Sequence, residues 1–235
     1  MCCRFFQDVE SSQVLKDILA EAARRQMALT GVNTVAHGEV FPSDVIAALA
    51  LSKNGCRASF PMHWGFQRRD GKGLIVNTRS ETANTSPLFR DSLRTRRCLI
   101  PASWYYEWET RNLQQNLFET EAGLSSTIQI EGTRLSPARR SCNTQKIKHA
   151  IRPNRQGLIY LAAIYRYEPD QKLPVCSILT RNAAPDIVFI HPRMPVIFSE
   201  ETALQWLDPQ TDPVQLMAQC RMDMSSHAVK EKSHA

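Results

Sequence analysis

The first clear pattern of apolar and polar positions lies in residues 11–26, where apolar side chains recur at helical spacing. These side chains are Val14, Leu15, Ile18, Leu19 and Ala22. The spacing puts them on one face of a helix, and Ser11 or Ser12 is in place to cap the first turn. The pattern therefore predicts an amphipathic helix.

Short apolar runs between turn residues predict β-strands. Periodicity alone does not assign residues 45–51, but Gly, Pro and Asp lie close to this run and favour a strand. Aromatic and β-branched content, or an apolar run after a turn, predicts strands in four further segments. These are residues 74–77, 98–109, 157–168 and 174–180.

Helices are expected at three later places. Residues 86–97 predict a short basic helix with Pro87 in its first turn, Ser199 is expected to cap a helix over 200–207, and residues 213–220 predict a last short helix. Residues 183–198 predict a helix or turn that leads through a proline-interrupted loop into a strand. Because helices and strands mix without regular βαβ alternation, the sequence predicts an α+β fold with largely antiparallel pairing.

Two stretches lack sustained periodicity. Residues 110–147 are expected to form an insertion or a long hairpin loop, and residues 230–235 to fray after Val229. No convincing domain boundary is visible, so one domain over residues 2–229 is expected.

Composition narrows the class of protein. No apolar run approaches the roughly 20 residues of a membrane span, and no signal-peptide region is visible, which predicts a soluble, cytoplasmic protein without membrane partners. Seven cysteines without C-x-x-C spacing and scattered histidines predict no metal site. Nucleotide-binding and hydrolase motifs are missing, so no cofactor is expected. A net charge of +6 is compatible with a polyanionic partner.

Cys2 is the first candidate for chemistry. Removal of Met1 would leave Cys2 with an α-amine of pKa about 7.7–8.0 and a thiol of pKa about 8.5 on adjacent carbons. Both groups react near neutral pH. The alternative is that Cys2 is merely a small residue in a frayed terminus.

Three later segments also carry reactive residue types. Asn77 and Arg79 alternate at the end of a strand, where Arg79 could bind a phosphate. Glu107 stands between aromatic residues that could desolvate it, and His191 lies between apolar runs, two residues before Arg193. The alternatives are a solvated strand end, a carboxylate facing water and a core histidine.

Together these segments resemble the SRAP family (SOS-response-associated peptidases). That family begins Met-Cys-Gly-Arg-Phe and continues with a Trp-Gly segment, an Asn-x-Arg-x-Glu-Thr strand end, a strand containing Glu-Trp and a His-x-Arg-Met-Pro-Val-Ile turn. Five segments of this chain match in the same order: MCCRF, MHWGF (62–66), NTRSETA (77–83), RCLIPASWYYEWE (97–109) and IHPRMPVIF (190–198). The resemblance implies a single SRAP-type domain with a barrel-like core flanked by short helices.

The resemblance also implies a function. Such a protein senses and shields abasic sites in single-stranded DNA, acts as a monomer near the nucleoid, and forms a thiazolidine crosslink through Cys2. His191 would assist sugar opening and proton transfer, Glu107 would orient the amine and the sugar and catalyse reversal, and Asn77 would hold the sugar or the amine. The implied DNA-binding residues are Arg4, Trp64, Arg79 and Arg193.

Two alternatives remain open on the sequence. Cys2 with His191 as base would also suit an N-terminal-nucleophile peptidase that processes itself. The chain departs from the family pattern at Cys3, where the family has Gly, and at Pro192, where it has Asp. These departures favour a third reading, a decayed module that binds single-stranded DNA without a covalent bond.

Overall fold

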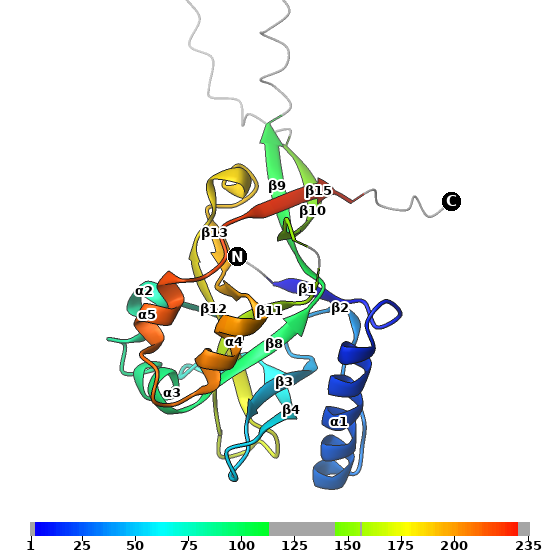
Figure 1. Cartoon of the computed structure of the whole chain (residues 1–235), viewed down its shortest axis with the longest axis vertical. Coiled ribbons are helices and arrows are strands. Elements are labelled where there is room, and N and C mark those ends of the chain that lie inside the picture. The colour runs from blue at the N-terminus through cyan, green and yellow to red at the C-terminus, as the bar shows by residue number, and fades with distance from the viewer. Residues whose placement is uncertain (1–2, 113–143, 156, 230–235) are drawn as a thin grey trace, which may run out of the picture.

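The computed structural model describes residues 3–112, 144–155 and 157–229 of the 235-residue chain (Figure 1). Within these residues, one long helix and several short ones surround sheets of mostly antiparallel strands, so the predicted α+β class is confirmed. None of the helices described there combines the length and the apolar character that a membrane crossing requires.

The elements follow the chain in a mixed order. The helices are α1 (Gln13–Thr30), α2 (Ser80–Ala83), α3 (Arg90–Thr95), the 3-10 helix η2 (Pro185–Ile187), α4 (Glu200–Leu207) and α5 (Pro213–Ala218). The strands up to the gap at 113–143 are β1 (Arg4–Gln7), β2 (Gly38–Val40), β3 (Val45–Leu51), β4 (Arg57–Trp64), β5 (Phe66–Gln67), β6 (Leu74–Ile75), β7 (Asn77–Arg79), β8 (Arg97–Ala102) and β9 (Trp104–Asn112). Beyond it lie β10 (Thr144–Pro153), β11 (Ile159–Arg166), β12 (Val175–Asn182), β13 (Arg193–Pro195), β14 (Ile197–Phe198) and β15 (Met224–Ala228).

Five strands close into a ring in the order β12–β4–β3–β8–β11 and back to β12. The interior of the ring is apolar, with fully buried Ile46, Ile100 and Leu161 among its side chains. Strand β3 is covered on both sides, because α1 packs its buried residues against the outside of the ring near Ala47. This explains why residues 45–51 form a continuous apolar run rather than an alternating one.

Helix α1 begins and ends as its sequence predicts. The Ser12 hydroxyl accepts a hydrogen bond from the backbone N–H of Leu15, and Gly31 takes a left-handed conformation (φ 79°) after the last turn. The predicted apolar face is buried at Leu15, Leu19 and Ala22. The capped, amphipathic helix is therefore confirmed.

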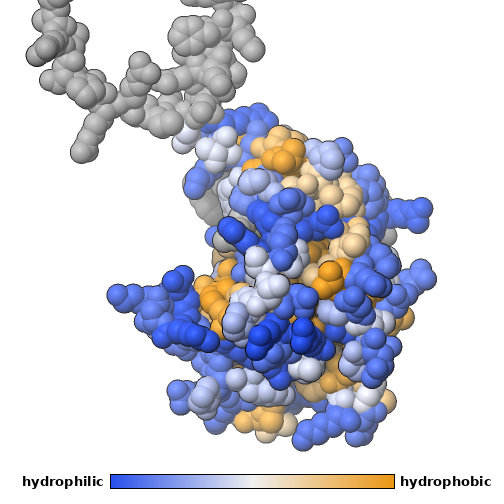
Figure 2. All heavy atoms as spheres, turned by 90° about the vertical axis from the view of Figure 1, so that its left-hand side faces the viewer, coloured by the Kyte–Doolittle hydropathy of each residue, from blue (hydrophilic) through white to orange (hydrophobic). Residues whose placement is uncertain are grey.

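A second sheet has the strand order β15–β10–β9–β1–β2. Strand β1 lies inside it and pairs antiparallel with β2 on one edge and β9 on the other. Figure 1 shows β9, β10 and β15 extending beyond the ring, with β1 and β2 beneath them. On the face shown in Figure 2, hydrophilic residues dominate and hydrophobic residues form small separate patches.

Several sequence predictions need correction. Residues 98–109 form two strands in different sheets, because the chain breaks at Ser103, whose hydroxyl accepts the backbone N–H of Asp8. Pro87 lies outside α3, which begins at Arg90. Residues 74–77 also span two strands, β6 and β7.

The predicted insertion is shorter than expected. Both ends of the range 110–147 are strand, since β9 runs to Asn112 and β10 starts at Thr144. These strands pair directly, with Asn112 opposite Thr144. Residues 113–143 and the expected frayed tail 230–235 lie outside the described residues.

Candidate active site

Glu107 lies on β9 with its side chain buried. Alternate side chains of a strand face opposite sides, so Tyr105, Glu107 and Glu109 share one side of the sheet. All three are buried, and Glu107 is only 4% exposed. Burial raises the pKa of Glu107 above its ordinary value, while nearby His191 opposes this shift. The result is a carboxyl group with increased proton affinity, as general acid–base chemistry requires.

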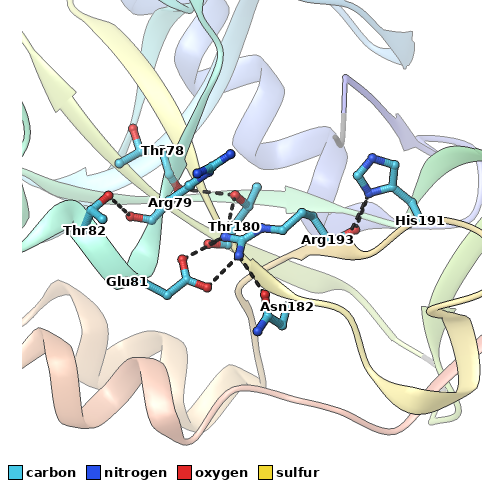
Figure 3. Close-up of polar contacts among 8 residues, drawn as sticks. All are labelled: Thr78, Arg79, Glu81, Thr82, Thr180, Asn182, His191 and Arg193. Atoms are coloured by element: carbon cyan, nitrogen blue, oxygen red, sulfur yellow. Dashed lines mark hydrogen bonds and ion pairs between the residues drawn. The ribbon is translucent and has the colours of Figure 1, made fainter.

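His191 follows η2 and precedes β13. Its Nδ1 lies 3.0 Å from the backbone nitrogen of Arg193 and 3.2 Å from the carbonyl oxygen of the same residue. An unprotonated Nδ1 accepts the N–H, and a protonated Nδ1 donates to the carbonyl. The turn through Pro192 thus provides a hydrogen-bond partner for either state of the ring (Figure 3).

Cys3 brings the start of the described chain to Glu107. Strand β1 pairs Arg4 with Tyr106, and the same register continued by one residue puts Cys3 opposite Glu107. Burial raises the pKa of the Cys3 thiol, and the negative charge of Glu107 adds to this shift. Cys2 itself lies outside the described residues.

Asn77 begins β7, which pairs in parallel with β12 so that Asn77 is opposite Ile178. The indole Nε1 of Trp64 donates a hydrogen bond to the carbonyl of Val76, directly before Asn77, at 3.0 Å. Trp64 has no exposed surface. The expected part of Trp64 in DNA binding stays a prediction, and in the structure the buried ring supports the strand that carries Asn77.

Arg193 is held by several acceptors (Figure 3). Its guanidinium donates to both carboxylate oxygens of Glu81, at 2.6 and 2.9 Å, and to the Thr180 carbonyl at 2.6 Å. It also reaches Asn182 at 3.0 Å. Arg79 is exposed. It lies on β7, which pairs with one edge of β12, whereas β13 with Arg193 pairs with the other edge. Of the two expected phosphate ligands here, Arg79 faces solvent and Arg193 is engaged with Glu81.

Arg4 lies on the other side of the second sheet from Glu107, because it pairs with Tyr106 rather than with a residue on the Glu107 side. Its guanidinium stacks over Phe41 at 4.4 Å and Trp108 at 5.0 Å, and it forms an ion pair with Glu39 at 3.1 Å. Arg4 is therefore placed beside aromatic rings rather than beside the buried carboxyl group.

The structure brings Cys3, Glu107 and His191 to one place, and puts Asn77 and Arg193 on strands that flank β12. Sequence reasoning missed two buried partners, Glu109 and His149. Alternation along β9 could have placed Glu109 on the Glu107 side. Nothing in the sequence could have paired His149 with them, since the register of β10 depends on the whole sheet.

The chain is similar to known proteins in sequence. A family model described as SOS response associated peptidase (SRAP) matches residues 1–233. The abasic site processing protein YoqW of Bacillus subtilis (strain 168) is 30% identical over 143 residues, which cover 59% of this chain and 50% of that protein. YobE of the same organism, also named an abasic site processing protein, is 30% identical over 59% of this chain and 52% of its own length. The match thus spans about half the length of these curated relatives.

Solved structures share the fold. A protein from Bacteroides thetaiotaomicron superposes with a TM-score of 0.66 at 17% identity, over 97% of this chain and 92% of that chain. A phage-related protein from Bordetella bronchiseptica gives a TM-score of 0.64 at 18% identity, over 98% of this chain and 95% of that chain. At these identities the likeness concerns the fold alone.

Proposed function

Since the chain belongs to the SRAP family, we propose that it recognises abasic sites in single-stranded DNA and binds them covalently through Cys2 after Met1 is removed. Two Bacillus relatives are named abasic site processing proteins, which supports an abasic site as the substrate. Their match spans about half of their length, so the activity of this chain is part of the proposal. We propose that it acts as a monomer.

The observation that carries the proposal is the meeting of the N-terminal strand with the buried Glu107 and the half-buried His191. Cys3 continues the β1 register opposite Glu107, and His191 lies near enough to lower the pKa of the same carboxyl group. Cys2 is joined to Cys3 by one peptide, a Cα separation of about 3.8 Å. An N-terminal cysteine in this position would be held beside groups that can move protons, which favours an intramolecular-like reaction.

The proposed chemistry needs no oxidant and no cofactor. The α-amine of Cys2 attacks the C1′ aldehyde of the ring-opened deoxyribose, and loss of one water gives a Schiff base. The Cys2 sulfur then adds to the imine carbon, while the thiol proton passes to nitrogen. The product is a five-membered thiazolidine, and the complex weighs one water less than its two components. Only an amine and a thiol on adjacent carbons can close this ring.

His191 and Glu107 divide the proton transfers. The backbone of Arg193 offers Nδ1 of His191 a hydrogen-bond partner whether that nitrogen is protonated or not. His191 therefore suits the proton transfer that opens the sugar. Glu107, with its raised pKa, suits protonation of the departing water and, in the reverse direction, hydrolysis of the crosslink. Asn77, half-buried at the start of β7, is proposed to orient the sugar.

Arginines near this centre and on the other side of the second sheet are proposed to bind the DNA backbone. Arg79 is exposed and can take a phosphate with two parallel hydrogen bonds. Arg4 lies among aromatic rings on the other side of the sheet, an arrangement that suits stacked bases and phosphate together. The net charge of +6 favours association with a polyanion. Trp64 is proposed only as the support of Asn77.

The test mixes purified protein with a single-stranded oligonucleotide that carries one abasic site, beside an intact-base control. A species that survives denaturation only with the abasic strand, at the mass of protein without Met1 plus DNA less one water, would support the proposal. Loss of that species in Cys2→Ala would assign the nucleophile. With Met1 removed and the protein folded, binding that is salt-sensitive but never covalent would contradict crosslinking and favour a non-covalent DNA-binding module.

A further inference from the structure

A second buried acid–base pair lies beside the proposed centre. The Nε2 of His149 is 2.9 Å from Oε2 of Glu109, and the two side chains are only 7% and 10% exposed. Arg111 binds the other oxygen of Glu109, and this contact, helped by His149, holds the pKa of Glu109 below its ordinary value. Glu109 is therefore ionised, and the Nε2 of His149 carries the hydrogen that it donates.

The pair faces the same side of the sheet as Glu107. Strand pairing puts His149 directly opposite Glu107, where the Cβ atoms of neighbouring strands are about 4.5–5.5 Å apart. Glu109 follows Glu107 by two residues and shares its side. The hydrogen bond from His149 thus runs diagonally across the sheet to Glu109 and fixes the ring beside Glu107.

The imidazole of His149 also supports the segment that carries His191. Its ring packs edge-on against Phe189, with centroids 6.0 Å apart and planes at 85°. Phe189 lies between η2 and His191, two residues before the histidine. A chain of contacts therefore runs from Arg111 through Glu109, His149 and Phe189 to the turn of His191.

We propose that Glu109 and His149 are positioning residues of this site, which hold the His191 turn against β10 at its working distance from Glu107. The inference rests on the proposed crosslinking function. Loss of such a contact is expected to slow the reaction, because a displacement of about 1 Å at a reacting centre can lower a rate by up to 100-fold.

A purely structural role explains the pair less well. A buried ion pair is often no more stabilising than apolar residues of similar volume. The Nδ1 of His149 is buried and has no hydrogen-bond partner among the described residues. This further lowers the contribution of the pair to the free energy of unfolding. The alternation of β9 would accept an apolar residue at position 109. The orientation of the ring, fixed by Glu109, is what an apolar residue could not supply.

The test compares Glu109→Leu, Phe189→Leu and Phe189→Tyr with the wild-type protein, since leucine at position 109 offers no acceptor for the Nε2 hydrogen of His149. Thr110→Val is the matched control, since Thr110 is exposed on the same strand and faces the other side. Three quantities are measured: melting temperature, affinity for single-stranded DNA carrying a tetrahydrofuran in place of the sugar, and the crosslinking rate with saturating abasic DNA. Rates are compared below the melting temperature of every variant.

Glu109→Leu and Phe189→Leu are expected to slow crosslinking by about tenfold while affinity for the tetrahydrofuran strand changes by less than about twofold. Phe189→Tyr keeps the ring contact and is expected to retain the wild-type rate, as is Thr110→Val. Folded Glu109→Leu and Phe189→Leu proteins that crosslink at the wild-type rate would overturn the inference, because a structural pair alters stability alone.

A second readout separates this inference from the proposed function. The backbone N–H of Arg193 donates to Nδ1 of His191, so its hydrogen exchange reports whether the ring is in place. Faster exchange at Arg193 in Glu109→Leu, but not in Thr110→Val, would support positioning even if the wild-type protein forms no crosslink. Unchanged exchange at Arg193 would overturn positioning even if wild-type crosslinking is demonstrated.

Discussion

Arg193 binds Glu81 with both terminal nitrogens of its guanidinium, at 2.6 Å from Nη1 to Oε1 and 2.9 Å from Nη2 to Oε2. The contact joins β13 to α2 across β12, with the carbonyl of Thr180 as a further acceptor at 2.6 Å. Hydrogen bonding by Arg193 lowers the pKa of Glu81, so the carboxylate stays charged near neutral pH. Glu81 therefore neutralises an arginine that the family resemblance assigns to a phosphate.

Glu81→Gln should release this arginine for DNA. We expect tighter binding of single-stranded DNA and a slope of log K against log salt that is steeper by about 0.7, as for one added phosphate contact. Fluorescence anisotropy over a salt series measures both. Glu201→Gln, at an exposed position of α4, makes the same change of net charge and is the control. Equal salt slopes for the two variants would mean that Arg193 contacts no phosphate.

Glu107→Gln should stabilise the protein at pH 7.5 while abolishing crosslinking. Because the folded state raises the pKa of Glu107, its contribution to stability is fully present below the unfolded pKa of about 4.3 and is lost as pH rises toward the folded pKa. Removing the ionisable group should therefore raise the melting temperature above that window and leave it nearly unchanged below. Thermal unfolding at pH 4 and 7.5 tests this, and a variant less stable than wild type at pH 7.5 would contradict it.

Cys3 should be dispensable for the chemistry although it lies at the site. Burial and the charge of Glu107 raise the pKa of its thiol, so near neutral pH it is protonated and a poor nucleophile. Cys3→Ala is expected to crosslink abasic DNA within about threefold of the wild-type rate, whereas Cys2→Ala should not crosslink at all. If the two variants lost the crosslink equally, the thiol of Cys2 could not be assigned as the nucleophile.

Trp64→Phe should act on Asn77 through the strand between them. Phenylalanine keeps most of the buried ring but loses the hydrogen bond to the Val76 carbonyl, a change expected to cost about 1–2 kcal/mol of stability. We expect slower crosslinking as well, because the start of β7 is no longer fixed. Denaturant unfolding and single-turnover rates measure the two effects. A variant that loses stability but keeps the rate would restrict Trp64 to a structural role.

The pattern of apolar and polar residues was enough to predict those helices and strands that depend mainly on their own sequence. The apolar stripe and Ser12 determine α1, and the buried run of residues 45–51 forms β3, as predicted. The division of residues 98–109 at Ser103 was not predictable. The division depends on β1, which lies about a hundred positions earlier in the chain. The backbone N–H of Ser103 donates to the carbonyl of Phe6, and the backbone N–H of Asp8 donates to the Ser103 hydroxyl. A single run of strand-forming residues does not reveal that its halves join different sheets.

The candidate site shows the same limit. The order of the family motifs pointed to Glu107 and His191, and in the structure His191 lies near enough to lower the pKa of Glu107. The engagement of Arg193 by Glu81 joins residues 112 positions apart and had no local signal. The pairing of His149 with Glu109 likewise follows from strand register. Side-chain partners of this kind are decided by tertiary packing rather than by propensity or spacing.

The place of β1 between β2 and β9 has a consequence for how the molecule is made. During synthesis β1 emerges about a hundred residues before β9, a delay of roughly 5–20 s at ordinary translation rates. Until then one edge of β1 has no strand to pair with, and the closing contact spans a long loop, which slows folding. The part of the site that joins Cys3 to Glu107 should thus form only after β9 has been made.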